Sequence, residues 1–146
     1  MKFLLDASAI LPLLTRSGRN LIVNATQADL IITDLAIYEA CNGLWKLATL
    51  LKTVSLRNAQ ELVALLNELT TKNLVQTVNF TAIDLLATLN LAQLNRLTFY
   101  DASYIVAAQR VKGILVTEDQ ELYKTANSYV KTISFAQLEK EFVNRS

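Results

Sequence analysis

The sequence predicts an α/β fold, a three-layer sandwich in which a central, mainly parallel sheet has helices on both faces. Short apolar runs of strand length alternate along the chain with longer helical segments, which is typical of parallel strands joined by helical crossovers. The chain has 146 residues, of which 52% are hydrophobic, enough for one domain with its own core. No repeat, low-complexity segment or linker divides it, so we expect a single domain over residues 1–146.

Each expected strand is a short apolar run, and together they cover residues 2–5, 30–32, 74–78, 111–116 and 129–133. The first of these runs ends at Asp6, and the second ends at Thr33 and Asp34. A carboxylate directly after a buried strand lies at the carboxyl edge of the sheet, where open α/β proteins form their sites.

The expected helices fill the stretches between the strands, at residues 7–14, 20–28, 35–51, 55–71, 81–94, 97–108 and 119–126, with a last one near the carboxyl end. Pro12 fits the first helix only if it lies in the first turn, because proline lacks the backbone N–H. Thr81 with Asp84, and Ser134 with Gln137, have the spacing of a capping box at a helix start.

Composition excludes several classes of site. The chain has no histidine, which excludes a Ser-His-Asp triad, a histidine base and a histidine-ligated zinc ion. The lone Cys41 allows no internal disulfide and fits a reducing compartment, so we expect a cytoplasmic protein. No apolar run is long enough to span a bilayer. The formal net charge of +1 means that nucleic acid would have to be held by a local patch.

Four acids have positions that suit a common site. Asp6 follows the first strand, Asp119 follows the strand at 111–116, and Asp101 lies in the first turn of its helix. Glu39 lies one turn into the helix at 35–51. Two carboxylates about 4 Å apart repel by roughly 4 kcal/mol at an effective dielectric constant of about 20, so such a cluster binds protons or cations. Oxygen ligands without histidine favour Mg²⁺ or Mn²⁺, and a metal-activated water that hydrolyses a phosphodiester bond is the natural reaction.

Each acid alone also has a structural interpretation. Asp101 follows Thr98 by three residues and could be the partner of a helix cap, while Glu39 could be a solvated helix residue. Thr117 with Gln120 could cap a helix and leave Asp119 as a first-turn acid. Asp6 is the hardest to explain without a function. The hypothesis of a metal site therefore rests on the convergence of all four.

Other polar residues are candidates for supporting roles. Ser8 and Thr117 could hydrogen-bond the acids or a metal-bound water, and Asn42 could orient Glu39 or touch substrate. Arg16 and Lys46 could meet substrate phosphate. Glu118 is either a fifth acid of the site or a residue turned to water, whereas Tyr100 and Tyr104 are expected to serve packing rather than base stacking.

Four short motifs in this order resemble those of PIN-domain nucleases: Asp6-Ala7-Ser8, Tyr38-Glu39-Ala40-Cys41-Asn42, Tyr100-Asp101-Ala102-Ser103-Tyr104 and Thr117-Glu118-Asp119. Their spacing and the chain length are most similar to the VapC toxins of VapBC toxin–antitoxin pairs. The resemblance implies a Rossmann-like parallel sheet and metal binding by Asp6, Glu39, Asp101 and Asp119. It also implies a Mg²⁺- or Mn²⁺-dependent endoribonuclease that forms homodimers and is inhibited by a VapB-type antitoxin.

Two alternatives within this resemblance stay open: a DNA- or structure-specific PIN nuclease, and a catalytically silent PIN-like interaction module. A haloacid-dehalogenase-like phosphatase would need an acid where Ser8 stands. A nicotinamide-binding domain would need a glycine-rich turn, and the three glycines are scattered.

Overall fold

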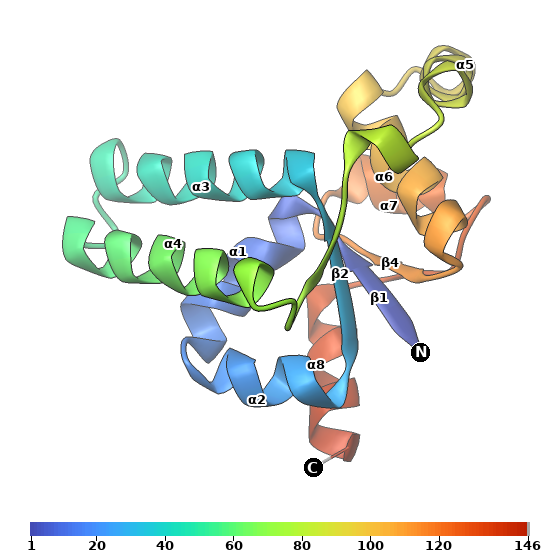
Figure 1. Ribbon diagram of the computed structural model, residues 1–146. Helices are drawn as coiled ribbons and strands as arrows, with labels where there is room; N and C mark the ends of the chain where they lie inside the picture. The colour runs from blue at the N-terminus through green and yellow to red at the C-terminus, as the bar shows by residue number, and fades with distance from the viewer. Residues whose placement is uncertain (146) are drawn as a thin grey trace.

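The computed structural model describes residues 1–145, with side chains to residue 143, and confirms the α/β sandwich (Figure 1). In this part of the chain five strands form one sheet: β1 (Lys2–Leu5), β2 (Asp29–Thr33), β3 (Gln76–Val78), β4 (Ile114–Val116) and β5 (Thr132–Ile133). Their order is β3-β2-β1-β4-β5, and every neighbouring pair is parallel.

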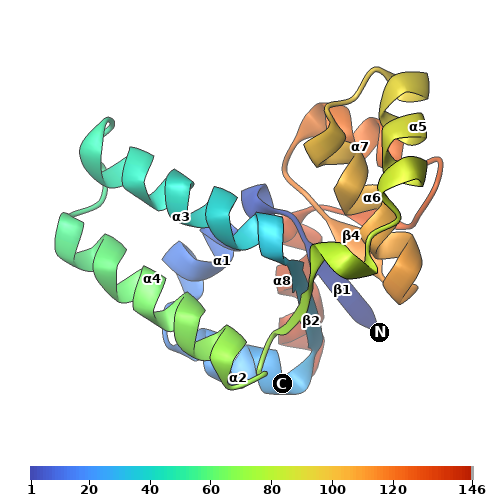
Figure 2. The same ribbon diagram turned by 45° about the horizontal axis from the view of Figure 1, so that its top comes forward.

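Two layers of helices cover the sheet (Figures 1 and 2). One layer holds α1 (Ala7–Ser17), α2 (Asn20–Gln27), α3 (Asp34–Thr49), α4 (Leu56–Thr71) and α8 (Phe135–Arg145). The other holds α5 (Leu85–Asn95), α6 (Phe99–Val111) and α7 (Gln120–Ala126), and a short 3₁₀ turn, η1 (Phe80–Ala82), follows β3. No helix in residues 1–145 has the length and apolar character needed to cross a membrane.

Burial on both faces explains why the strands are short apolar runs. Phe3, Leu4 and Leu5 of β1 are completely buried, as is Leu115 of β4. Each such side chain contributes about 1.5–3 kcal/mol on leaving water. The central strands therefore hold the hydrophobic core and fix the positions of the residues that follow them.

The strand order reverses between β1 and β4. From β1 the chain adds β2 and β3 on one side, then crosses back and adds β4 and β5 on the other. Leu5 pairs with Val116, and the Asp6 amide donates a 3.2 Å hydrogen bond to the Val116 carbonyl. Asp6 and the residues after Val116 therefore meet at the carboxyl edge, where α/β sheets open a crevice.

Three local expectations need correction. Pro12 lies in the interior of α1, which continues to Ser17; the missing N–H costs one helical bond, and burial of Leu13 and Leu14 holds the helix together. Asp84 is itself the N-cap of α5, accepting from the Ala87 amide at 3.0 Å, so it is not the partner of a Thr81 cap.

The strand expected at 111–116 is also shorter. Helix α6 continues through Val111 and ends at Lys112, whose φ of 55° lies in the left-handed region, so β4 begins only at Ile114. The capping box at the start of α8 is confirmed: Gln137 N donates to Ser134 Oγ, and Ser134 N donates to Gln137 Oε1 at 2.8 Å.

Candidate active site

Asp6 is held by three hydrogen bonds at the junction of β1 and α1. As the N-cap of α1, its Oδ1 accepts from the Ala9 amide at 3.0 Å and from Ser8 Oγ at 2.6 Å. Its Oδ2 accepts from Thr117 Oγ1 at 2.5 Å. The carboxylate thus has a structural role as a cap, which the sequence did not indicate, and its orientation is fixed from both sides.

Burial makes Asp6 an unusual carboxyl group. Its side chain is only 4% exposed, and this burial raises its pKa from 3.8 to about 6. The hydrogen bonds from Ser8, Thr117 and Ala9 oppose the rise, and the negative charge of Asp119 adds to it. The ionised form therefore gains from any positive charge brought to this edge.

Thr117 connects the acids that follow β1 and β4. Its side chain is 1% exposed, donates to Asp6, and accepts from the Asp119 amide at 3.0 Å. Of the two alternatives for Thr117, the hydrogen bond to an acid is confirmed, and the cap of the next helix is wrong. Asp119 is the N-cap of α7, with Oδ1 accepting from the Leu122 amide at 3.0 Å.

Glu39, on the second turn of α3, is bound by a residue of α6. Tyr104 Oη donates to Glu39 Oε1 at 2.5 Å. Tyr104 is buried, and burial followed by its bond to Glu39 raises its pKa above the ordinary value for tyrosine. We expected only packing for Tyr104; its position one helical turn after Asp101 was the available signal.

Asp101 lies in the first turn of α6, half-buried. Thr98 is the N-cap of this helix and accepts from the Asp101 amide at 3.0 Å, which confirms the cap at this position. Burial raises the pKa of Asp101, and the negative charges of Asp119, Glu39 and Glu121 raise it further. Asp119 therefore raises the pKa of both Asp6 and Asp101, and Glu121 is an acid near Asp101 that the sequence did not indicate.

Glu118 belongs to the junction with the last helix. Its Oε1 accepts a 2.8 Å hydrogen bond from the Phe135 amide at the start of α8, and its own amide donates to Ser8 Oγ at 2.9 Å. Glu118 is exposed, which agrees with the expected alternative of a residue turned to water, and its contact with Phe135 is an additional structural role.

The remaining candidate residues make no described contact with the four acids. Arg16 is in the last turn of α1, 3.3 Å from Glu139 Oε2 and 5.7 Å above the Phe135 ring, so it ties α1 to α8. Asn42 and Lys46 lie on exposed turns of α3, and in the described chain neither makes a side-chain hydrogen bond or ion pair. Tyr100 is 59% exposed, so its expected packing is wrong.

The oxygen donors at this edge suit a hard divalent cation. Among the described residues, no group of three or more Asp, Glu or Cys side chains is arranged to hold a metal ion by itself. Mg²⁺ does not require such a cage, since it commonly takes one or two carboxylates and completes its shell with waters and substrate phosphate oxygens. The buried Asp6 carboxylate and the mutual repulsion of the acids fit such an ion.

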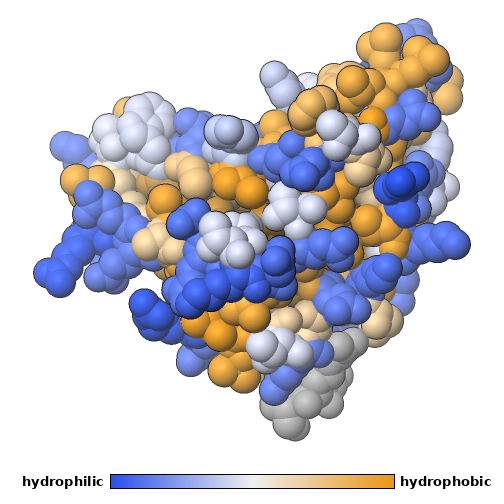
Figure 3. Space-filling view, in the orientation of Figure 1, coloured by the Kyte–Doolittle hydropathy of each residue, from blue (hydrophilic) through white to orange (hydrophobic). Residues whose placement is uncertain are grey.

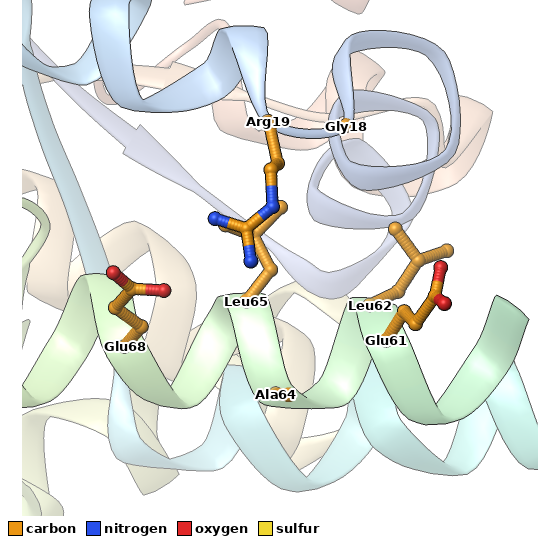
Figure 4. Close-up of a pocket in the computed structure, with 7 residues that line it drawn as sticks. All are labelled: Gly18, Arg19, Glu61, Leu62, Ala64, Leu65 and Glu68. Carbon is orange, nitrogen blue, oxygen red and sulfur yellow. The ribbon is translucent and has the colours of Figure 1, made fainter. Parts of the chain in front are cut away.

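A separate hollow lies between the α1–α2 turn and α4 (Figure 4). Arg19 extends into it between Glu61 and Glu68. Both glutamates have other cationic neighbours, since Arg57 lies 3.6 Å from Glu61 and Lys72 lies 2.9 Å from Glu68. None of the four acids lines this hollow, so it is separate from the candidate active site at the carboxyl edge of the sheet.

Comparisons with known proteins agree with this architecture. The family model of the PIN domain matches residues 3–128. Ribonuclease VapC3 of Pyrobaculum aerophilum is 34% identical over 125 residues, which cover 84% of this chain and 92% of the relative. Exonuclease VapC9 of the same organism is 32% identical over 122 residues, which cover 84% of each chain.

A solved structure extends the agreement to the whole fold. The crystal structure of PAE2754 from Pyrobaculum aerophilum superposes with a TM-score of 0.74 at 28% sequence identity, covering 99% of this chain and 90% of the other. The match to the PIN model, the two relatives above 30% identity and this shared fold cover nearly all of the chain. The protein therefore belongs to the PIN-domain family, among its VapC-type members.

Proposed function

We propose that this protein is a VapC-type toxin, a metal-dependent endoribonuclease with its active site at Asp6, Glu39, Asp101 and Asp119. The observation that supports the proposal is that Asp6 and Asp119 follow the two strands between which strand order reverses, while Asp119 raises the pKa of both Asp6 and Asp101 and Glu39 raises that of Asp101. The similarity to a relative named as a ribonuclease supports RNA as the substrate.

The protein's own residues orient the acids. Ser8 and Thr117 hold the two oxygens of Asp6, and Tyr104 holds one oxygen of Glu39. With Asp101 and Asp119, these acids would hold Mg²⁺ or Mn²⁺. A cation bound here supplies Lewis-acid activation of water and neutralises charge on the phosphodiester. Asn42 and Lys46 remain proposed substrate contacts on α3, whereas the ion pair of Arg16 with Glu139 makes Arg16 a weaker one.

Two apolar surfaces fit the expected protein partners. A groove of about 450 Å³ between α3 and α4 is lined by Leu44, Trp45, Leu56 and Val63, and it fits an apolar segment of a VapB-type antitoxin. Helix α5 exposes Leu85, Leu86, Leu89 and Leu94 and forms part of the apolar surface at the upper right of Figure 3, which fits a homodimer contact. RNA targets and a single cysteine fit the cytoplasm.

A second candidate function is exonucleolytic cleavage, because one relative is named as an exonuclease. A circular single-stranded RNA distinguishes endonucleolytic from exonucleolytic cleavage, since it has no end and only an endonuclease can cut it. Fluorescent circular and linear RNA of one sequence are incubated with antitoxin-free protein in Mg²⁺, Mn²⁺ or EDTA. We expect metal-dependent linear products from the circle, and no cleavage by Asp6→Asn or Asp101→Asn.

Cleavage that persists in EDTA or in both variants would contradict the metal site. Degradation of linear RNA alone would favour the exonuclease, and cleavage of DNA but not RNA would favour a DNA-directed PIN nuclease. A folded wild-type protein that neither binds Mn²⁺ nor cleaves any of these substrates would favour the silent interaction module.

A further inference from the structure

A groove rich in positive charge lies beside the carboxyl-terminal end of α6. Three cations line it, namely Lys2 at the start of β1 and Arg110 and Lys112 at the end of α6. The rest of its wall is largely polar and comes from β3 and the η1 turn: Gln76, Thr77, Asn79 and Thr81. None of the described residues that line this basic groove is acidic, and its volume is about 450 Å³.

The three cations are exposed, and in residues 1–145 none has a carboxylate oxygen within 4.0 Å. Asp29 lies opposite Lys2 in the β1–β2 register without forming such a pair. The backbone brings the charges together, because a Cβ at Gly113, next to Lys112, would lie 3.2 Å from the Lys2 carbonyl oxygen. Like charges gathered in one groove repel one another, and an anionic ligand relieves that repulsion.

The basic groove contrasts with the nearly neutral charge of the whole chain. Because the formal net charge is +1, these three cations leave a net charge of −2 on the remainder. A net charge close to zero is therefore compatible with a local basic surface. A local surface of this kind is what a nearly neutral protein needs in order to hold a polyanion.

Helix α6 connects the basic groove to the acids. Asp101 lies in its first turn and Arg110 in its last, nine residues later, which is about 13–14 Å along the helix. The η1 turn joins the two regions as well. Thr81 lines the basic groove, while the adjoining Phe80 lines a small hollow with Tyr100 and Ser103, the residues that flank Asp101 on α6.

We propose that the basic groove binds the phosphate backbone of single-stranded RNA at nucleotides away from the cleaved bond. This inference rests on the proposed ribonuclease function and identifies where the substrate is held. The cations would meet phosphates, and the amides and hydroxyls of Gln76, Asn79 and Thr81 would hydrogen-bond phosphate or ribose 2′-hydroxyl oxygens. Such contacts carry no sequence information, so the groove supplies affinity rather than target choice.

The test is a binding measurement that needs no catalysis. Fluorescence anisotropy with a 12-nucleotide fluorescein-labelled single-stranded RNA is recorded in EDTA over a range of salt concentrations. The groove variant combines Lys2→Gln, Arg110→Gln and Lys112→Asn, with asparagine chosen because it tolerates positive φ. The matched control combines Lys52→Asn, Arg57→Gln and Lys140→Gln, which remove the same charge elsewhere and do not line the groove; Lys52 receives asparagine because it too has positive φ.

We expect the groove variant to bind at least 10-fold more weakly than wild type at about 0.1 M salt, with an unchanged melting temperature. Each lost phosphate contact should reduce the slope of log K against log salt by about 0.7, so three contacts should reduce it by about 2. The control variant should keep most of the wild-type affinity and slope. Cleavage of the same RNA in Mg²⁺ should fall through a raised KM with kcat retained.

Equal losses in the groove and control variants would overturn the inference, because binding would then depend only on net charge. A groove variant that binds RNA with wild-type affinity would also overturn the inference. An acidic protein would then be the ligand that fits the basic groove. Because binding is measured in EDTA, a wild-type protein that binds RNA through the groove but does not cleave it would refute the nuclease and not the groove.

Discussion

Tyr104 and Glu39 are 65 residues apart in the sequence, and a hydrogen bond of 2.5 Å joins them across α6 and α3. The tyrosine is 2% exposed, so its hydroxyl is fixed by packing, whereas Glu39 projects from an exposed turn of α3. The buried residue therefore sets the position of the accessible carboxylate. It also links two of the four proposed metal-binding acids, because Asp101 precedes Tyr104 by one turn of the same helix.

Tyr104→Phe should lower activity more than stability. The ring keeps its packing and the exposed Glu39 can be solvated by water, so we expect a loss of about 1 kcal/mol in the free energy of unfolding. Removing a residue that orients a metal ligand typically lowers metal affinity or activity about 10-fold or more. Mn²⁺ titration calorimetry and cleavage rates measure this effect.

Tyr129→Phe is the matched control for that variant. It also removes a tyrosine hydroxyl that is hydrogen-bonded, to Asn95 at 2.9 Å, without a contact to any of the four acids. Cleavage and Mn²⁺ affinity should remain at the wild-type level. If both tyrosine variants lost activity equally, Tyr104 would have no specific role in orienting Glu39.

Thr117→Val should weaken both the fold and the site. Valine has a similar shape but leaves Asp6 without one donor and the Asp119 amide without its acceptor, which we expect to cost about 1–3 kcal/mol. Cleavage should fall at least 10-fold. Thr88→Val serves as the control, because Thr88 is equally buried and its hydroxyl donates only to the Asp84 carbonyl. Thr88→Val should lower the free energy of unfolding but leave the rate of RNA cleavage per folded molecule unchanged.

Stability in EDTA should decrease as pH rises from about 4 to about 6. Burial raises the pKa of Asp6 from 3.8 to about 6, so the folded chain binds this proton more tightly than the unfolded chain does. The folded state is therefore favoured below pH 3.8 and loses that advantage as pH rises to about 6. A difference of this size corresponds to about 3 kcal/mol at most.

Asp6→Asn should flatten this part of the stability curve, because asparagine does not titrate. Denaturant unfolding at several pH values in EDTA gives both curves. The variant should be at least as stable as wild type at pH 7, although it should not cleave RNA. Identical pH dependence in the two proteins would show that Asp6 titrates normally in the folded state.

Glu118 should contribute to stability and not to cleavage. Glu118→Ala removes the acceptor for the Phe135 amide at the start of α8, and loss of such a cap costs about 1 kcal/mol. Glu118→Gln keeps an acceptor and should remain close to wild type in melting temperature. Both variants should cleave RNA, whereas Asp119→Asn should not. Loss of cleavage in Glu118→Gln would instead make Glu118 a member of the acidic site.

Local pattern was sufficient to predict much of the fold. The alternation of apolar runs with helical segments predicted the parallel sheet, because a strand buried on both faces must be apolar throughout. The capping box of Ser134 and Gln137 was also predictable, since its partners are three residues apart. Errors fell where a local rule competes with packing, as at Pro12, which lies inside a helix with a buried face.

The sequence singled out the candidate acids and named Ser8 and Thr117 as possible hydrogen-bond partners, but it did not indicate that Tyr104 binds Glu39. Asp6, Asp101 and Asp119 each stand beside an expected strand end or helix start, so their common edge could be inferred before the strand order was known. Glu118 was ambiguous because its hydrogen-bond partner lies 17 residues away. Spacing along the chain carries no information about such a contact.

The sequence by itself determined the fold class, because this depends on hydrophobic period, and it singled out four candidate acids by their positions at or near element ends. Only the tertiary structure decided that Thr117 holds Asp6, that Tyr104 holds Glu39, and that Lys2 lies with Arg110 and Lys112 in one groove. Thr117 is more than 100 residues from Asp6, Tyr104 is 65 residues from Glu39, and Lys2 is more than 100 residues from Arg110 and Lys112. Strand order and helix packing bring them together, and hydrogen bonds and charge act only at the short distances that result.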